Sequence, residues 1–222
     1  MRITEVETIV LRLPSVADVS DGSQDAFVVR IHTDAGITGI GEADSMPTVL
    51  KAAFDAPTSN SIGHGLRSLL IGQDPRDIEP LLKRLMAGTL YLHGSGFGLT
   101  AISGAEIALW DIAGKAAGAS VSRLLGGAFR KRIRAYASVL FPEDKTDTDF
   151  VRETGKRLVQ KGFTAVKFGW GGFGQDWRSD VALAKAARQS VGDDIDLMID
   201  VGLCWDARTA IERARMLEEF RL

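Results

Sequence analysis

The chain has 222 residues, of which 45% are hydrophobic and 25% are charged, and its formal charge is −2. This composition is typical of a globular protein with one large domain or two smaller ones. The near-neutral charge and the absence of Lys/Arg runs exclude an electrostatic surface for nucleic acid or for an anionic membrane. No apolar stretch reaches the ~18–20 residues that a membrane span needs. The single cysteine, Cys204, excludes an internal disulfide framework and is typical of a protein in the reducing cytoplasm.

The N-terminal part begins with strands. Apolar and polar residues alternate over 3–10, which predicts a half-buried antiparallel strand rather than a signal peptide. Residues 26–33 and 37–42 are predicted as two further strands, joined by a turn at 34–36. Helices are predicted to follow, one after a possible N-cap at Asp77 and one, over 103–117, that is apolar around most of its circumference. We therefore predict an α+β capping domain over residues 1–125.

After Gly126 and Gly127 the pattern changes to alternating strands and helices. Strands are predicted at 132–139, 165–168 and 197–201, and each is followed by a helix, at 148–161, 179–190 and 207–220. Repeated βα units of about thirty residues are typical of a parallel sheet with crossover helices. We predict that residues 126–222 are the first three βα units of a TIM-like (β/α) barrel. Since a complete barrel needs ~250 residues, we expect the barrel to be truncated here.

Two charged residues stand at the ends of predicted strands, where barrel enzymes carry their working groups. Asp200 ends an apolar run, and it is either a ligand of a hard cation such as Mg²⁺ or the cap of the next helix, for which Asp206 is better placed. Lys167 either binds a substrate carboxylate and raises the acidity of the neighbouring carbon, or extends into solvent.

Further candidates lie near these strand ends and in loops of the N-terminal part. Ser138 lies at the end of the first predicted strand of this part. Trp170 lies in the segment 168–174, where four glycines among three aromatics predict a backbone that turns sharply beside a site. His64 and His93 lie in glycine-rich loops and could face a pocket, whereas His32 is expected to be solvated. No pair of histidines has the spacing of a helical metal site.

The segment 101–115, which reads AISGAEIALWDIAGK and continues to RLLGG at 123–127, carries a resemblance. It resembles the signature of the mandelate racemase/muconate lactonizing enzyme family of the enolase superfamily, with Ala105 in place of a larger aliphatic residue. The segments 72–75 and 39–43 look like further family features, and the resemblance runs in register from residue 1 to residue 222.

The resemblance implies a chemistry. Family members bind a carboxylate substrate on Mg²⁺, abstract the proton next to the carboxylate and stabilise the resulting enediolate. By resemblance, Asp200 is the first of three metal-binding carboxylates, and the other two are expected beyond Leu222. Lys167 matches the first of two family lysines, while Gly169 replaces the second, which usually serves as the base. Gly202 stands where many members have an asparagine.

The missing lysine favours one reaction over others. Racemisation needs an acid or base on each face of the carbon, whereas β-elimination needs one base and an acid that helps hydroxide leave. We therefore predict an acid-sugar dehydratase. A racemase, an epimerase or a cycloisomerase of the same family is the alternative, and a non-catalytic truncated remnant is the alternative of another class. The 222-residue chain alone is expected to be inactive.

In this family two loops of the capping domain choose the substrate, and they correspond to roughly 14–25 and 44–64. Both loops are rich in polar side chains, Asp21 and His64 among them, which suits a polyhydroxylated acid, although ordinary solvated loops would look alike. Substrate-binding residues are accordingly predicted at Ser138, Trp170, Asp21 and His64. The expected partners are a sugar acid and further copies of the chain in a homo-oligomer.

Overall fold

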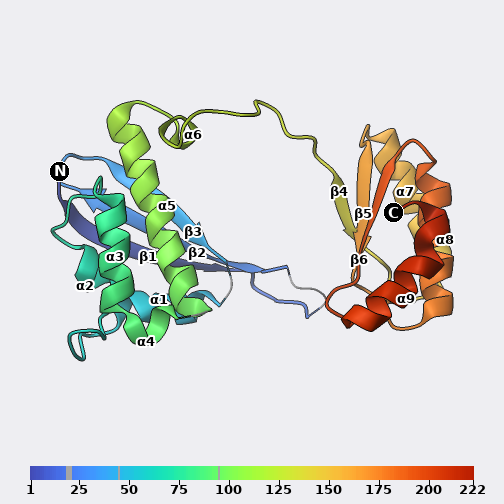
Figure 1. Cartoon of the computed structure of the whole chain (residues 1–222), viewed down its shortest axis with the longest axis horizontal. Coiled ribbons are helices and arrows are strands. Elements are labelled where there is room, and N and C mark those ends of the chain that lie inside the picture. Colours follow the sequence, from blue (N-terminus) through green and yellow to red (C-terminus); the bar gives the residue numbers. More distant parts are fainter. Residues whose placement is uncertain (19–21, 45, 95) are drawn as a thin grey trace. The chain divides into compact units, whose positions relative to one another are not determined.

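The structure, a computed structural model, describes residues 1–18, 22–44, 46–94 and 96–222. The chain divides into two compact units, one made of Met1–Val16 and Gly22–Phe129 and the other built on Arg130–Leu222. Each unit has a hydrophobic core of its own. None of the helices in the described ranges is long and apolar enough to cross a membrane. Figure 1 shows the elements of both units.

The first unit contains an antiparallel sheet of three strands in the order β1 (Ile3–Arg12), β2 (Asp25–Thr33) and β3 (Thr38–Ala43). All three predicted strands are confirmed, and β1 continues two residues further than the alternation indicated. On β2 every second side chain is buried, among them Phe27, Val29 and Ile31. The sheet therefore turns one face to the core of this unit.

Six helices belong to the same unit: α1 (Pro47–Asp55), α2 (Leu66–Leu70), α3 (Ile78–Gly88), α4 (Leu90–His93), α5 (Phe97–Ala117) and α6 (Val121–Leu124). The long helix α5 lies across the sheet (Figure 1). A Cβ atom at Gly41 would lie 2.0 Å from the carbonyl oxygen of Gly104 on α5. The missing side chain is therefore what lets α5 pack this close to β3. Asp77 precedes α3 as predicted, but its side chain caps no backbone N–H group.

Two charged residues of α5 bond the outer edge of β3. The carboxylate of Asp111 accepts a hydrogen bond from the Ile40 backbone N–H at 2.8 Å, and the Lys115 ammonium donates to the Thr38 carbonyl at 2.7 Å. Asp111 and Lys115 also form an ion pair at 2.7 Å. These contacts satisfy backbone groups that an edge strand otherwise leaves unpaired. Part of the 101–115 segment thus has a structural role.

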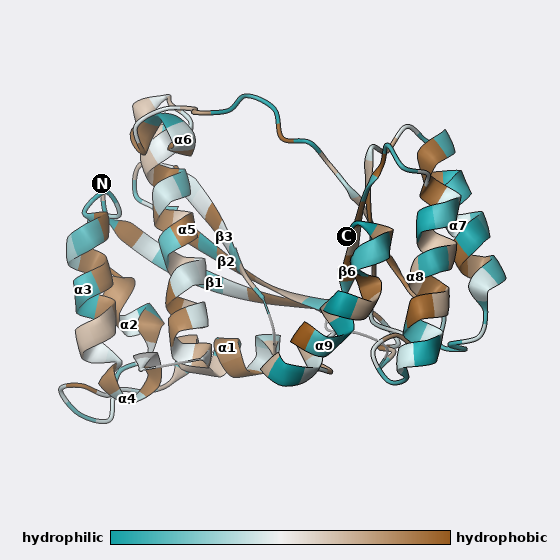
Figure 2. Ribbon diagram, turned by 45° about the vertical axis from the view of Figure 1, so that its right-hand side comes forward, coloured by the Kyte–Doolittle hydropathy of each residue, from teal (hydrophilic) through white to brown (hydrophobic). Residues whose placement is uncertain are grey.

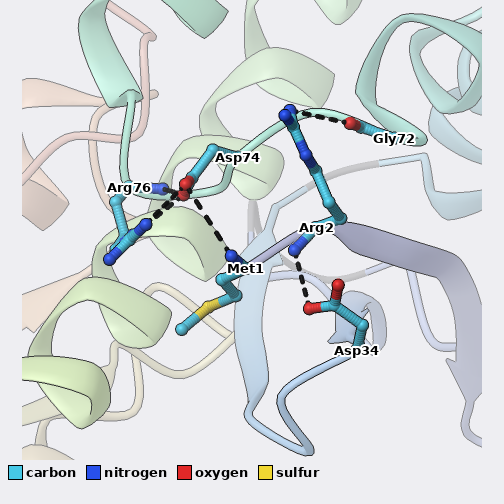
Figure 3. A network of polar contacts seen from close by, with 6 residues as sticks. All are labelled: Met1, Arg2, Asp34, Gly72, Asp74 and Arg76. Carbon is cyan, nitrogen blue, oxygen red and sulfur yellow. Dashed lines mark hydrogen bonds and ion pairs between the residues drawn. The ribbon is translucent and has the colours of Figure 1, made fainter.

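A polar network holds the segment 72–76 to the beginning of β1 (Figure 3). The Met1 amine lies 4.0 Å from the Asp74 carboxylate, and Arg2 donates from its backbone N–H to Asp34 and from its guanidinium to the Gly72 carbonyl. Arg76 donates two side-chain hydrogen bonds to Asp74 and holds the pKa of that carboxyl well below its usual value. The motif at 72–75 is therefore also structural.

The second unit contains a parallel sheet in the order β4 (Ala137–Leu140), β5 (Ala165–Gly169) and β6 (Asp196–Asp200). The helices are α7 (Thr148–Gln160), α8 (Trp177–Val191) and α9 (Ala207–Leu217), followed by the 3₁₀ turn η1 (Glu218–Phe220). Buried side chains of α7 and α8 form one core with Val166 and Phe168 of β5 and Leu197 of β6. The predicted alternation of parallel strands and helices is confirmed. The structure shows this small parallel sheet with its helices, and closure into a barrel stays a prediction.

Three predicted boundaries are wrong. The helix expected from residue 103 already begins at Phe97, the first residue of α5. The first strand was expected from residue 132, but β4 begins at Ala137. The preceding Arg134 donates instead to Thr164 and Asp196 at the start of the neighbouring strands. The last helix was expected to run to residue 220, but α9 ends at Leu217, the one helix residue that is buried. Figure 2 shows α9 as largely hydrophilic.

Candidate active site

The candidate site lies on the face of the parallel sheet that α7 and α8 do not cover. Ser138, Lys167 and Met198 are neighbours in the β4–β5–β6 register, and Leu140, Gly169 and Asp200 are neighbours two residues further on. Neighbouring residues of parallel strands point to the same side of a sheet. The sheet therefore brings Ser138 and Lys167 to one face, with Asp200 beside them at the carboxyl end.

Lys167 and Asp200 form an ion pair across β5 and β6. The ammonium nitrogen of Lys167 donates to Oδ2 of Asp200 at 3.0 Å. The side chains are only partly exposed, at 26% for Lys167 and 38% for Asp200. The Lys167 amine also lies 5.9 Å from the ring centre of Tyr136, which precedes β4 and was not singled out in the sequence. The pair leaves both charged groups accessible from the open face.

The Asp200 carboxyl is held in its ionised form. Its pKa is lowered first by a hydrogen bond from the Gly202 backbone N–H, 3.1 Å from Oδ1, and then by Lys167, while partial burial opposes both. Asp206, rather than Asp200, caps α9, because Oδ1 of Asp206 accepts from the Thr209 N–H at 2.7 Å. Capping therefore does not explain Asp200, which remains a candidate ligand for a cation.

Gly169 brings β5 and β6 close together at this point. A Cβ atom at position 169 would lie 2.8 Å from the Cβ of Asp200 and 3.1 Å from its carbonyl oxygen. Any larger residue at position 169 would have to displace Asp200 or the backbone of β6. The glycine that stands here in place of the second family lysine therefore fits the close packing of β5 against β6.

The glycine-rich segment continues the wall of the site. Trp170 has a left-handed backbone conformation with φ of 53°, and its N–H donates to the Asp200 carbonyl at 3.0 Å. Its ring packs on Gly202, where a Cβ atom would lie 2.7 Å from the nearest ring carbon. Gly202 itself has φ of 57°, a conformation that favours glycine. The glycine and the tryptophan ring thus fit each other.

The loops after the three strands pack against one another. Gly172 donates to the Pro142 carbonyl at 3.0 Å, and the rings of Phe141 and Phe173 stack with centres 4.6 Å apart. The indole N–H of Trp205 donates to the Gly174 carbonyl at 2.8 Å. The three loops therefore form one continuous rim beside Lys167 and Asp200.

Asp180 on α8 is a residue that the sequence analysis missed. It is 1% exposed, and its Oδ1 accepts from the Gly174 N–H at 2.8 Å. Burial raises the pKa of this carboxyl. Among the described residues, neither its Oδ2 nor the buried Nη1 of Arg213 has a hydrogen-bond partner. In the sequence, Asp180 looks like an ordinary acidic residue of a first helical turn.

The remaining residues that the sequence singled out lie in different environments. Ser138 is exposed on the open face. His64 lies in the first unit, with its Nδ1 3.1 Å from the Thr58 hydroxyl, and its role stays a prediction. Asp21 lies outside the described residues. His32, expected to be solvated, is partly buried between Glu7 and Thr38, and Cys204 is exposed.

The donor set fits one ligand of a magnesium site. Asp200 offers an accessible, ionised carboxylate, which is the kind of ligand that Mg²⁺ takes. Within the described ranges, however, no three His, Cys, Asp or Glu side chains are grouped as a metal site requires. The described residues therefore do not complete a site by themselves.

Comparison with known families and relatives agrees with this fold. The family model described as mandelate racemase / muconate lactonizing enzyme, N-terminal domain, matches residues 3–126, and the one described as enolase C-terminal domain-like matches 149–222. D-galactarolactone cycloisomerase of Agrobacterium fabrum is 35% identical over 95% of this chain and 54% of its own length. Arabinonate dehydratase of Saccharolobus solfataricus is 29% identical over 92% of this chain and 52% of its own length. The chain spans about half the length of these relatives.

Solved structures agree as well. The crystal structure of a predicted mandelate racemase from Rhodobacter sphaeroides is 33% identical with a TM-score of 0.84, covering 99% of this chain and 56% of that one. A racemase from Streptomyces coelicolor with bound magnesium is 27% identical with a TM-score of 0.82. The match covers 99% of this chain and 60% of the racemase. Since the first family model alone covers more than half of the sequence, the chain belongs to the mandelate racemase/muconate lactonizing enzyme family of the enolase superfamily.

Proposed function

We propose that this chain is part of an enzyme that removes the proton next to the carboxylate of a sugar acid and then eliminates water. The observation that carries the proposal is the arrangement of β5. It presents one ammonium group, that of Lys167, 3.0 Å from Asp200, and a glycine at the next position on the same face. Related proteins include dehydratases of arabinonate, D-xylonate and D-gluconate, which supports a sugar acid as substrate.

Lys167 would act as an electrostatic group rather than as the base. Its ammonium would contact a substrate carboxylate oxygen and stabilise the negative charge that develops there when the neighbouring C–H bond is broken. Gly169 cannot accept the proton, so the base would be a group of the whole protein outside β5. Water would leave from the next carbon, and the enol formed would rearrange to a 2-oxo acid.

Asp200 would supply one carboxylate to a bound Mg²⁺ ion, which contributes a positive charge beside the substrate carboxylate. Trp170 and Ser138 would line the substrate-binding face, and the loops 14–25 and 44–64, with Asp21 and His64, would select the substrate. We further propose that residues 1–125 form the capping domain and that residues 126–222 begin a (β/α) barrel. We also propose that the protein works in the cytoplasm as a homo-oligomer.

The test is substitution of Lys167 by Met in the whole protein, followed by exchange of the substrate's C2 deuterium into solvent. Turnover should fall by about 10²–10³-fold, the scale for loss of one charge-stabilising donor. Exchange should slow but persist, because the base lies elsewhere. Complete loss of exchange with substrate binding retained would make Lys167 the base and would end the argument for a dehydratase.

A cycloisomerase is the second candidate, favoured by the 35% identity to the Agrobacterium enzyme. The two reactions differ in their products. A dehydratase releases a product that is lighter than its substrate by one water, whereas a cycloisomerase converts a lactone into an isomer of the same mass, so mass spectrometry of the product distinguishes them. A panel of aldonic acids, aldaric acids and their lactones would separate them. A racemase, as among the relatives, would keep both the composition and the connectivity of the substrate and invert one stereocentre.

A further inference from the structure

Gly174, the last residue of the glycine-rich loop, is held from two sides. Its N–H donates to Oδ1 of Asp180 at 2.8 Å, and its carbonyl accepts from the indole N–H of Trp205 at 2.8 Å. Its φ is 98°, and a Cβ atom there would lie 3.2 Å from the Cβ of Cys204. The peptide of Gly174 is thus fixed between α8 and the loop that follows β6.

Capping of α8 does not explain Asp180. The cap is Asp176, whose Oδ2 accepts from the Ser179 N–H at 3.0 Å. Asp180 is 1% exposed, and Oδ2 has no hydrogen-bond partner among the described residues. Burial of a carboxyl group with one oxygen unsatisfied destabilises a fold. The hydrogen bond from Gly174 is the largest contribution that compensates this cost, and the attraction of Arg213 adds to it.

A short chain of contacts leads from Gly174 to the candidate site. Its neighbour Phe173 is fully buried, and the Phe173 N–H donates to the Trp170 carbonyl at 3.3 Å. Trp170 in turn donates to the Asp200 backbone and packs on Gly202. Gly202 donates to the Asp200 carboxylate at 3.1 Å. Movement of Gly174 would therefore displace the groups that orient this carboxylate.

We propose that Asp180 is a positioning residue for the Asp200 site. It anchors Gly174, keeps Trp170 against Gly202 and thereby sets the orientation of the Asp200 carboxylate, without touching substrate itself. The inference rests on the proposed function only in taking Asp200 and Lys167 as the reacting site. Its test reads the structure of the chain, so its failure would leave the deuterium exchange experiment on Lys167 unaffected.

The test uses the full 222-residue chain labelled with 5-fluorotryptophan. Its four tryptophans give ¹⁹F resonances that single Trp→Phe variants assign. In Asp180→Ala, the resonances of Trp170 and Trp205 should shift or split, because the loop loses its anchor. In Asp180→Asn, the amide oxygen can still accept from Gly174, so both resonances should return close to their wild-type positions. Trp110, in the other unit, should not move in either variant.

Leu183→Ala is the matched control, since Leu183 lies on the same helix, is fully buried and belongs to the same core. It should lower stability while leaving the Trp170 resonance in place. An unchanged Trp170 resonance in Asp180→Ala, or an equal shift in Leu183→Ala, overturns the proposal. If Asp180→Ala does not fold, hydrogen exchange of the Gly174 amide replaces the ¹⁹F measurement. Protection of this amide in both wild type and Asp180→Asn supports the proposal. Lack of protection in wild type overturns it.

Discussion

Asp180 and Asp200 are two aspartates of the same unit whose pKa values move in opposite directions. Burial raises the pKa of Asp180, while the Gly202 N–H and the Lys167 ammonium lower the pKa of Asp200. Desolvation disfavours the charged form, whereas donors and an opposite charge favour it. The same residue type therefore contributes to stability with opposite dependence on pH.

Substitution of Asp180 by Asn should change how stability depends on pH. A carboxyl whose folded pKa is raised stabilises the fold below its unfolded pKa of ~3.9, and this contribution is lost as pH rises through the folded pKa. The free energy of unfolding of Asp180→Asn should therefore increasingly exceed that of wild type as the pH rises above the unfolded pKa of ~3.9. Urea denaturation at several pH values measures this difference.

Asp200→Asn is the control for that experiment, because the sign is reversed. A lowered folded pKa contributes stability above the unfolded value, and the contribution is lost as pH falls through the folded pKa. Asp200→Asn should therefore lose most stability relative to wild type at neutral pH and least in acid. Parallel pH profiles for the two variants would contradict both assignments.

At the scale of elements, glycines set how closely helices approach their neighbours. Gly41 on β3 faces the backbone of Gly104 on α5, and Gly155 on α7 faces Ser190 on α8, where a Cβ atom would lie 1.9 Å from the hydroxyl oxygen. Asp111 and Lys115 then bond the edge of β3 from the same helix α5. The 101–115 segment is thus a packing and edge-bonding device of the first unit.

Gly41→Ala should destabilise the first unit by about 1–3 kcal/mol, the usual scale of overpacking in a tight core. The added methyl would meet the Gly104 carbonyl oxygen at 2.0 Å, so backbone must move. Urea denaturation followed by the ¹⁹F resonance of 5-fluorotryptophan at Trp110 on α5, the one tryptophan of the first unit, reports the loss. Gly94→Ala is the matched control, since a Cβ atom at Gly94 meets nothing within 4 Å and its φ is −61°. Equal losses in both variants would argue against close packing as the cause.

At the scale of the whole molecule, the question is how many metal ligands the described residues supply. The described residues place one carboxylate, Asp200, on the open face of the parallel sheet, and no group of three metal-binding side chains exists within them. Mg²⁺ keeps much of its water shell and binds tightly only where several oxygens replace it. The described residues therefore do not form a complete metal site, and Asp200 stays a candidate for one of its ligands.

We expect the 222-residue chain to bind Mg²⁺ only weakly, with an affinity poorer than micromolar. Titration calorimetry with MgCl₂ on wild type and Asp200→Asn measures it, and the weak heat that remains should be smaller in the variant. A micromolar dissociation constant in wild type, abolished in Asp200→Asn, would show that further ligands come together in this chain.

Much of the architecture follows from local pattern. Alternation with period two predicted β1, β2 and β3, and the βα rhythm predicted the parallel order of β4, β5 and β6, because burial of one or both faces imposes these periods. Lys167 and Asp200 were found because parallel strands place their carboxyl ends at the same edge of a sheet. Their 3.0 Å contact agrees with that reasoning.

Other features depend on contacts between segments distant in sequence. Residues 132–136 alternate as a strand would, yet no segment in the described part of the chain pairs with them as β-sheet. Arg134 bonds Thr164 and Asp196 instead. Asp180 lies in a first helical turn, and only the loop that ends at Gly174 makes it buried. The sequence by itself determined the six strands, the helices that alternate with β4, β5 and β6, and the two charged strand ends, because these follow from short-range periodicity. It did not predict the short helices α1, α2, α4 and α6 of the first unit. Tertiary structure alone decided that position 169 has no room for a side chain and that Asp180 is buried. Both depend on which segment packs against the residue, Asp200 in the first case and the loop at Gly174 in the second.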